Sequence, residues 1–189
     1  MARETEEFAS IFNEVYPGLC RFLNCMMAGA GGPSAPEDIA QESFLKLHRE
    51  GLARFGEGEA RFWLFRVARN MALNELNRGR TRHRLLDRVV EALRPGARDP
   101  QSDYERAERG EILTEMLKRL PEQQRAALLL REQEGMGYRE IAEVLGVSEG
   151  KVKVDVFRAR SSLRERWART QEAAASEGKN FNGLPKLVL

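Results

Sequence analysis

The segment 138–160 constrains the fold of this chain most, because its pattern predicts two helices joined by a tight turn. Apolar residues recur three to four positions apart in its first half: Ile141, Ala142 and Leu145. Gly146 ends that first helix, since glycine adopts a left-handed turn conformation without a Cβ penalty. Val147 fills the corner, and the Ser148 hydroxyl can accept a backbone N–H at the start of the next helix. A short helix, a glycine turn and a second helix form the helix-turn-helix pattern that docks in a DNA major groove.

The second helix of this motif is basic, with five Lys or Arg between Lys151 and Arg164 against one acid, Asp155. On a helical wheel, one side is apolar and is expected to pack on the preceding helices: Val152, Val156, Ala159, Leu163 and Trp167. The opposite side is free to enter a groove: Lys151, Val154, Phe157, Arg158 and Ser161. Such side chains contact phosphates, guanine edges and thymine methyl groups. The turn chemistry favours DNA binding over a merely solvated charged face.

The rest of the chain also has helical periodicity and no strand-like alternation of any length, which predicts an all-α fold. A helix over residues 8–26 is expected to break or kink near Pro17. A second helix begins near Pro36 and runs to about Arg49, a loop covers 51–60, and a long helix covers 62–77 and ends near Gly79. We expect these elements to form an N-terminal four-helix bundle.

Proline and glycine divide the remaining chain. Residues 94–102 contain two prolines and no apolar period, which indicates a linker. Helix resumes near Tyr104, and Pro121 begins another helix, with Leu128 and Leu129 facing inward. The tail from Thr170 is polar and is expected to be mobile, although its last six residues are apolar again. The predicted division is therefore 1–84, a flexible linker 85–104, a second small helical domain 105–169 and a tail 170–189.

Charge is distributed unevenly among the 189 residues, whose net charge is only +2. Residues 61–84 hold seven Arg against one acid, and residues 148–169 hold seven Lys or Arg against three acids. Two separated basic patches predict two contacts with a polyanion. The first patch interleaves arginines with aromatic residues and Asn70, and this combination suits unstacked bases. Trp63 and Phe65 fit a base platform and a buried core equally well.

Asp38, Gln41 and Glu42 share one side of the helix that follows Pro36. They could form a metal site, a solvated surface or a protein interface. No His joins them at ligand spacing, so we expect no metal, and the sequence indicates no cofactor. Cys20 and Cys25 are expected to be small buried residues, with redox sensing left open.

Other function classes find little support. No residue set for catalysis is evident, so we do not expect an enzyme. There is no signal peptide and no apolar run long enough to span a bilayer, so we expect no membrane insertion and a cytoplasmic protein.

Four motifs in this order resemble the extracytoplasmic-function (ECF) group of the sigma-70 family of bacterial RNA polymerase initiation factors. They are Pro36-Glu-Asp-Ile-Ala-Gln-Glu-Ser-Phe-Leu-Lys-Leu47, Phe62-Trp-Leu-Phe-Arg-Val-Ala-Arg-Asn70, Leu120-Pro-Glu-Gln-Gln-Arg125 and the helix-turn-helix that ends Val156-Phe-Arg-Ala-Arg160. The resemblance extends from about Phe8 to Trp167. It implies that 1–84 is sigma domain 2 and that 105–169 is sigma domain 4.

The resemblance also implies partners: core RNA polymerase, promoter DNA and possible control by an anti-sigma factor. Polymerase-binding residues would be Asp38, Gln41, Glu42 and Phe44. Residues that open the −10 element and hold a flipped base would be Phe55, Arg61, Trp63, Arg66, Arg69 and Asn70. Residues that read the −35 duplex would be Lys151, Lys153, Val154, Phe157 and Arg158. The linker would run through the nucleic-acid channels of the polymerase.

This chain departs from the family pattern at three positions. Many members have Thr, Ser and Arg where this chain has Lys151, Val154 and Asp155. An Asp beside phosphates is repulsive unless it accepts from a cytosine amino group or pairs with a nearby Arg. The tail beyond Arg169 also has no counterpart, and we expect its apolar end to dock on the sigma domains or on a regulator. The competing interpretation is a stand-alone helix-turn-helix regulator that binds duplex DNA by itself.

Overall fold

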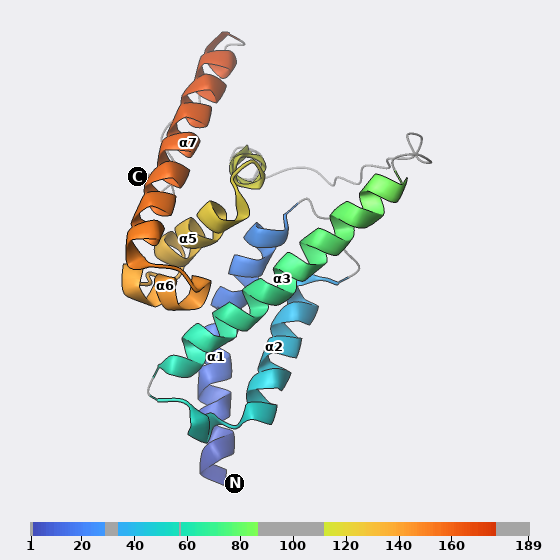
Figure 1. Cartoon of the computed structure of the whole chain (residues 1–189), viewed down its shortest axis with the longest axis vertical. Helices are drawn as coiled ribbons and strands as arrows, with labels where there is room; N and C mark the ends of the chain where they lie inside the picture. The colour runs from blue at the N-terminus through green and yellow to red at the C-terminus, as the bar shows by residue number, and fades with distance from the viewer. Residues whose placement is uncertain (1, 29–33, 57, 87–111, 177–189) are drawn as a thin grey trace.

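A computed structural model describes residues 2–28, 34–56, 58–86 and 112–176 of the chain. Every regular element in these ranges is a helix, which confirms the predicted all-α fold. The elements form an N-terminal unit (residues 2–86) and a C-terminal unit (residues 112–176), which lie side by side in Figure 1.

The N-terminal unit contains α1 (Ala2–Met27), α2 (Pro36–Glu50), the 3-10 turn η1 (Leu52–Arg54) and α3 (Glu59–Leu86). Helix α2 begins as predicted: Pro36 occupies the first turn, where a missing N–H costs nothing, and acidic side chains follow at the positive helix end. The three long helices pack on one another around buried apolar side chains.

Two helix boundaries in this unit differ from the sequence prediction. Helix α1 continues through Pro17, so the described part of the unit has three α-helices and a 3-10 turn where four helices were expected. Helix α3 continues through Gly79 to Leu86. A glycine inside a helix costs only about 1 kcal/mol relative to alanine, so it does not by itself end a helix whose neighbours continue the pattern.

The C-terminal unit contains a helical segment at residues 112–118, then α5 (Glu122–Glu132), α6 (Tyr138–Leu145) and α7 (Glu149–Ser176). Pro121 stands immediately before α5, and Leu128 and Leu129 are fully buried as predicted. The apolar side of α7 is also buried as predicted: Val152, Val156, Ala159, Leu163 and Trp167. Helix α7 extends to Ser176, so residues 170–176, expected in a mobile tail, are helical.

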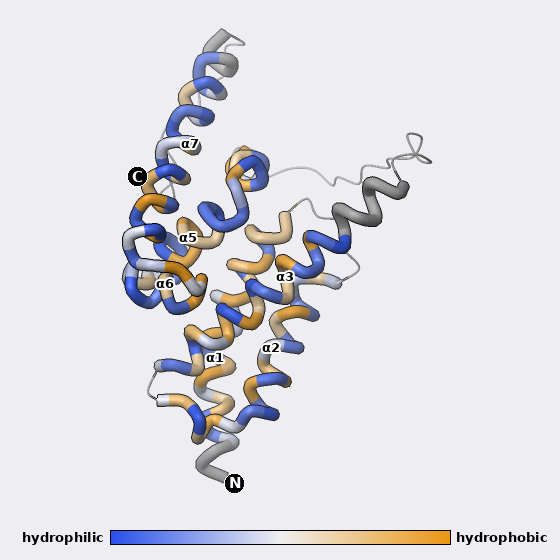
Figure 2. The backbone as a smooth tube through the Cα atoms, viewed as in Figure 1, coloured by the Kyte–Doolittle hydropathy of each residue, from blue (hydrophilic) through white to orange (hydrophobic). Residues whose placement is uncertain are grey.

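The buried residues of the two units form one continuous hydrophobic cluster rather than two separate cores. Helix α1 packs against α5, and α3 packs against α6. Figure 2 shows apolar segments gathered where the helices face one another, with polar segments outside. Residues 85 and 86, predicted to begin the linker, are instead the end of α3. The rest of the predicted linker, the start of the helix expected near Tyr104 and the tail from residue 177 lie outside the described residues.

Candidate nucleic-acid interface

The turn between α6 and α7 has the geometry that its sequence predicts. Gly146 ends α6 in the left-handed conformation, with φ of 66°. Its N–H donates to the carbonyl of Ala142, which satisfies one of the free acceptors at the helix end. The Ser148 hydroxyl accepts from the backbone N–H of Lys151 at 3.3 Å and so caps α7.

The first turns of α7 present an exposed row of side chains on the side away from the core. Its members are the five residues predicted to read duplex DNA: Lys151, Lys153, Val154, Phe157 and Arg158. Phe157 is 69% exposed, an unusual position for so large an apolar side chain. An exposed mixture of cations and apolar groups on one helix can contact phosphates and thymine methyl groups in a major groove.

Ion pairs along α7 hold two of these lysines. The Lys153 ammonium lies 2.7 Å from the Glu149 carboxylate, whose hydrogen bond and charge raise the pKa of Lys153. Lys151 pairs with Asp155 one turn later. The Asp155 side chain is only 1% exposed, so it is a buried partner of a lysine, and it does not lie on the surface where a cytosine could contact it.

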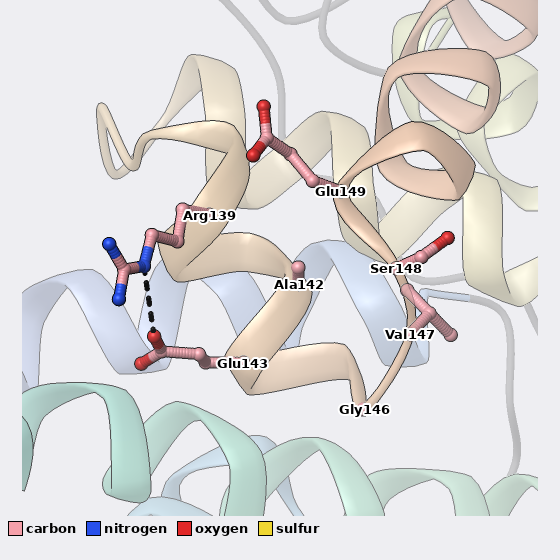
Figure 3. Close-up of a pocket in the computed structure, with 7 residues that line it drawn as sticks. All are labelled: Arg139, Ala142, Glu143, Gly146, Val147, Ser148 and Glu149. Atoms are coloured by element: carbon pink, nitrogen blue, oxygen red, sulfur yellow. Dashed lines mark ion pairs between the residues drawn. The ribbon is translucent and has the colours of Figure 1, made fainter.

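A shallow hollow of about 530 Å³ lies on the outer side of the helix-turn-helix corner. Figure 3 shows Arg139 and Glu143 on α6 and Glu149 across from them at the start of α7. The Arg139 and Glu143 side chains form an ion pair at 3.8 Å. This hollow is open to solvent and carries both signs of charge on its rim.

The arginines of α3 that were predicted to contact DNA point toward the C-terminal unit. The Arg61 guanidinium donates to the backbone carbonyl of Glu134 at 2.8 Å. Arg66 donates to the carbonyl of Glu143 at 2.6 Å. Arg69 donates to the Gln123 side chain at 2.7 Å, and burial lowers the pKa of Arg69. These interactions link the two units through the same basic patch that the sequence assigned to DNA.

Asn70 and the aromatic pair lie beside these arginines. Asn70 is exposed, and its side-chain oxygen accepts from Arg69 at 3.3 Å. The half-buried rings of Phe55 and Trp63 meet edge to face, with centroids 5.5 Å apart. Phe65 is fully buried, so of the two aromatics that the sequence left undecided it is the core residue. Trp63 keeps part of its ring accessible near Phe55.

The predicted polymerase-binding residues of α2 occupy three different environments. Asp38 accepts from the backbone N–H of Ala35 at 3.1 Å and so caps its own helix. Gln41 is exposed and hydrogen-bonded to Tyr16 of α1, and half-buried Glu42 pairs with Arg49 at 3.8 Å. Phe44 is only 3% exposed, so it belongs to the core beneath this surface.

Leu45 of α2 is 53% exposed and therefore lies on that surface beside the polar residues. Leu45 was not among the residues predicted to bind the polymerase. Its exposure could have been suspected, since it follows Phe44 by one position and so lies about 100° around the helix from a core residue.

Two residues that join the units were also not predicted from the sequence as functional positions. Arg125 and Glu134 have side chains that are almost completely buried between elements of both units. A charged residue followed by the apolar run Ala126–Leu130 indicates that the side chain at position 125 could be buried. Nothing local marks Glu134, because its partners are more than seventy positions away in the chain.

The two cysteines are free and half-buried rather than fully buried as expected. Burial raises the pKa of the Cys20 thiol, which lowers its thiolate fraction and its reactivity. Among the described residues, no group of His, Cys, Asp and Glu side chains is arranged to hold a metal ion. The described helices include none with the length and apolar character needed to cross a membrane.

Comparison with known proteins matches both units. The family model of Sigma-70 region 2 matches residues 11–82, and the model of Sigma-70, region 4 matches residues 110–163. The ECF RNA polymerase sigma-E factor of Haemophilus influenzae is 34% identical over 137 residues, which cover 68% of this chain and 72% of that protein.

The chain belongs to the ECF group of the sigma-70 family. The region 2 match runs along α1, α2 and α3 of this sigma factor, and the region 4 match ends near the middle of α7. The alternative of an unrelated helix-turn-helix regulator is not favoured, because the N-terminal unit also matches the family.

One further relative and one solved structure are also similar to this chain. The ECF RNA polymerase sigma factor SigE of Mycolicibacterium smegmatis is 31% identical over 147 residues, and this match covers 77% of this sigma factor but only 57% of the mycobacterial protein. The sigma factor RpoE of Bartonella quintana, solved in complex with the anti-sigma factor NepR, shares the fold with a TM-score of 0.63. At 24% identity, that alignment covers 86% of this sigma factor and 98% of the solved chain.

Proposed function

We propose that this sigma factor binds core RNA polymerase, directs it to specific promoters and assists their opening. The observation that carries the proposal is the exposed row on α7, on a helix whose opposite side is buried in the C-terminal unit. A helix anchored in this way presents a fixed set of side chains to a major groove. In this proposal, Lys151, Lys153, Val154, Phe157 and Arg158 read the −35 element as duplex DNA.

The N-terminal unit has the other two roles in the proposal. The surface of α2 around Asp38, Gln41 and Glu42 docks on the polymerase, and Leu45 adds an exposed apolar contact of the kind that interfaces use. The basic patch of α3 and the accessible part of the Phe55–Trp63 pair hold the −10 strand after it is unpaired. Capturing an unstacked base there offsets an unpairing cost of about a few kcal/mol.

Promoter-dependent run-off transcription tests this function directly. The chain is added to purified core RNA polymerase with fragments of the source genome as templates, and discrete run-off products are expected. A variant with Lys151, Val154 and Arg158 all changed to Ala serves as the control, and it should lose these products while it still binds the polymerase. Sequence-specific duplex binding by the chain alone, with no transcription in the presence of polymerase, would favour a stand-alone regulator instead.

We also propose that a protein inhibitor controls this sigma factor. The support is that the solved relative from Bartonella quintana was captured with the anti-sigma factor NepR. Affinity purification of the tagged chain from its own cells, followed by mass spectrometry, should recover a small partner that blocks run-off transcription when it is added back. Deletion of residues 183–189 in the same assay tests whether the apolar end of the tail contributes to that binding.

A further inference from the structure

The contact between the two units is built around a buried carboxylate. The Glu134 side chain is 7% exposed and lies 3.5 Å from the Arg61 guanidinium and 3.7 Å from that of Arg21. It also lies directly over Gly18 of α1, where an added Cβ would be only 2.5 Å from the carboxylate. The glycine therefore leaves the space that lets the C-terminal unit seat this residue against α1 and α3.

A buried guanidinium makes a second attachment near the end of α1. Arg125 donates to the carbonyl of Met26 at 2.8 Å and, within its own unit, to the carbonyl of Lys118 at 2.7 Å. Its positive charge lies at the carbonyl end of α1, where the helix dipole favours a cation. Nearby, the Gln133 amide donates to the sulfur of Cys25 at 3.3 Å. Cys25 therefore reports on whether this contact is closed.

The closed contact occupies the side of α3 that carries Arg61, Arg66 and Arg69. All three donate hydrogen bonds to residues between Gln123 and Glu143 of the C-terminal unit. DNA lying along this side of α3 would overlap the segment from α5 to α6. The C-terminal unit and a nucleic-acid strand are therefore alternative occupants of one surface.

We propose that the free chain is closed by this contact, and that single-stranded DNA and the C-terminal unit compete for the basic side of α3. This proposal rests on the proposed role of α3 in −10 binding. Because only open molecules can bind DNA, the apparent affinity of the free chain equals the affinity of the open form multiplied by the fraction of molecules that are open. Because coupling is reciprocal, DNA bound to α3 must favour the open form by the same factor.

Alkylation of Cys25 in a Cys20→Ser chain measures the opening. Glu134→Gln removes the charge that pairs with two arginines, and Gly18→Ala displaces the carboxylate while it favours the helical form of α1. In both variants, Cys25 should react with a maleimide at least roughly fivefold faster than in the parent chain. A fivefold change is the lower end of the usual range of coupling between two sites.

Two matched controls keep the alkylation test specific. Glu132→Gln makes the same change in an ion pair with Arg160 that lies within the C-terminal unit. Gly150→Ala adds a Cβ in open space on α7. Neither should change the rate for Cys25, and equal rates in all four variants and the parent chain would overturn the proposal.

DNA binding supplies the second measurement. A fluorescent single-stranded oligonucleotide at low salt should bind Glu134→Gln and Gly18→Ala more tightly than the parent by the factor seen in alkylation, and it should itself speed alkylation of Cys25. No effect of the oligonucleotide on Cys25 would show that the two occupants do not compete. Failure of run-off transcription would count against the proposed function instead, so the two failures are distinguishable.

Discussion

The carboxylate of Asp155 is buried in α7, and its partner Lys151 is 48% exposed one turn earlier. The sequence identified Asp155 as a departure from the family and allowed pairing with a nearby Arg. The spacing of four positions also allows a pair with Lys151, but the burial of Asp155 follows from how α7 packs on α5 and α6. That packing depends on residues distant in sequence, so a wheel drawn for one helix cannot supply it.

We expect Asp155→Asn to strengthen duplex binding by the chain, because Lys151 would then offer a full charge to phosphate. The slope of log affinity against log salt should steepen by roughly 0.9, the value for one additional phosphate contact. Fluorescence anisotropy at several salt concentrations measures this slope. Glu165→Gln, which removes an exposed acid farther along α7, is the control and should leave the slope unchanged. An unchanged slope in Asp155→Asn would contradict the assigned role of the pair.

Asn70 and Arg158 are both exposed, but they lie on different units and should affect different steps. Asn70→Ala should reduce promoter opening more than −35 binding, which permanganate reactivity of the −10 strand would measure. Arg158→Ala should do the reverse and cost about 1–3 kcal/mol of duplex affinity if it contacts a base. Equal effects of both variants on both steps would contradict the division of roles.

At the scale of single elements, the helix-turn-helix was the most predictable part of the molecule. Gly146, Ser148 and the apolar side of α7 act through local geometry, so their pattern fixes their structure. Helix ends were less predictable: α1 runs through Pro17, and α3 runs through Gly79. Tertiary packing outweighs the propensity of one residue at such positions.

Gly146→Ala should destabilise the C-terminal unit, because a left-handed alanine costs about 1–2 kcal/mol. Equilibrium urea unfolding followed by circular dichroism measures the loss. Gly150→Ala is the matched variant: it adds the same methyl group in open space within a helix, where alanine is favoured over glycine by up to about 1 kcal/mol. Equal stability of the two variants would mean that the left-handed turn does not limit this fold.

At the scale of the whole molecule, both units could be predicted, but not the contact between them. Arginines such as Arg61 and Arg66 form the same sequence pattern whether they contact phosphate or a backbone carbonyl. Their partners lie more than seventy positions away, so no local pattern marks them. The roles proposed for these residues on DNA remain predictions.

Arg125 gives the most direct test of how the units support each other. Arg125→Ala should cost at least about 1–3 kcal/mol of unfolding free energy, because it leaves buried backbone carbonyls such as that of Met26 without their donor. Urea unfolding monitored by tryptophan fluorescence measures the loss, since Trp63 and Trp167 lie in different units. Arg169→Ala, which removes a 75% exposed arginine, should change stability by less than about 1 kcal/mol. A similar small effect at Arg125 would show that the contact contributes little.

The lack of a side chain at Gly18 means that the residues accepted at positions 18 and 134 depend on each other. In a relative with any larger residue at position 18, the end of the Glu134 side chain would have to shift, because an added Cβ would lie 2.5 Å from the carboxylate. Substitutions at positions 18 and 134 should therefore occur together across lineages, with a larger side chain at the first accompanied by a shorter or uncharged one at the second. Paired replacement at these two positions would identify which members of the family keep a Glu134 carboxylate packed over Gly18 and which do not.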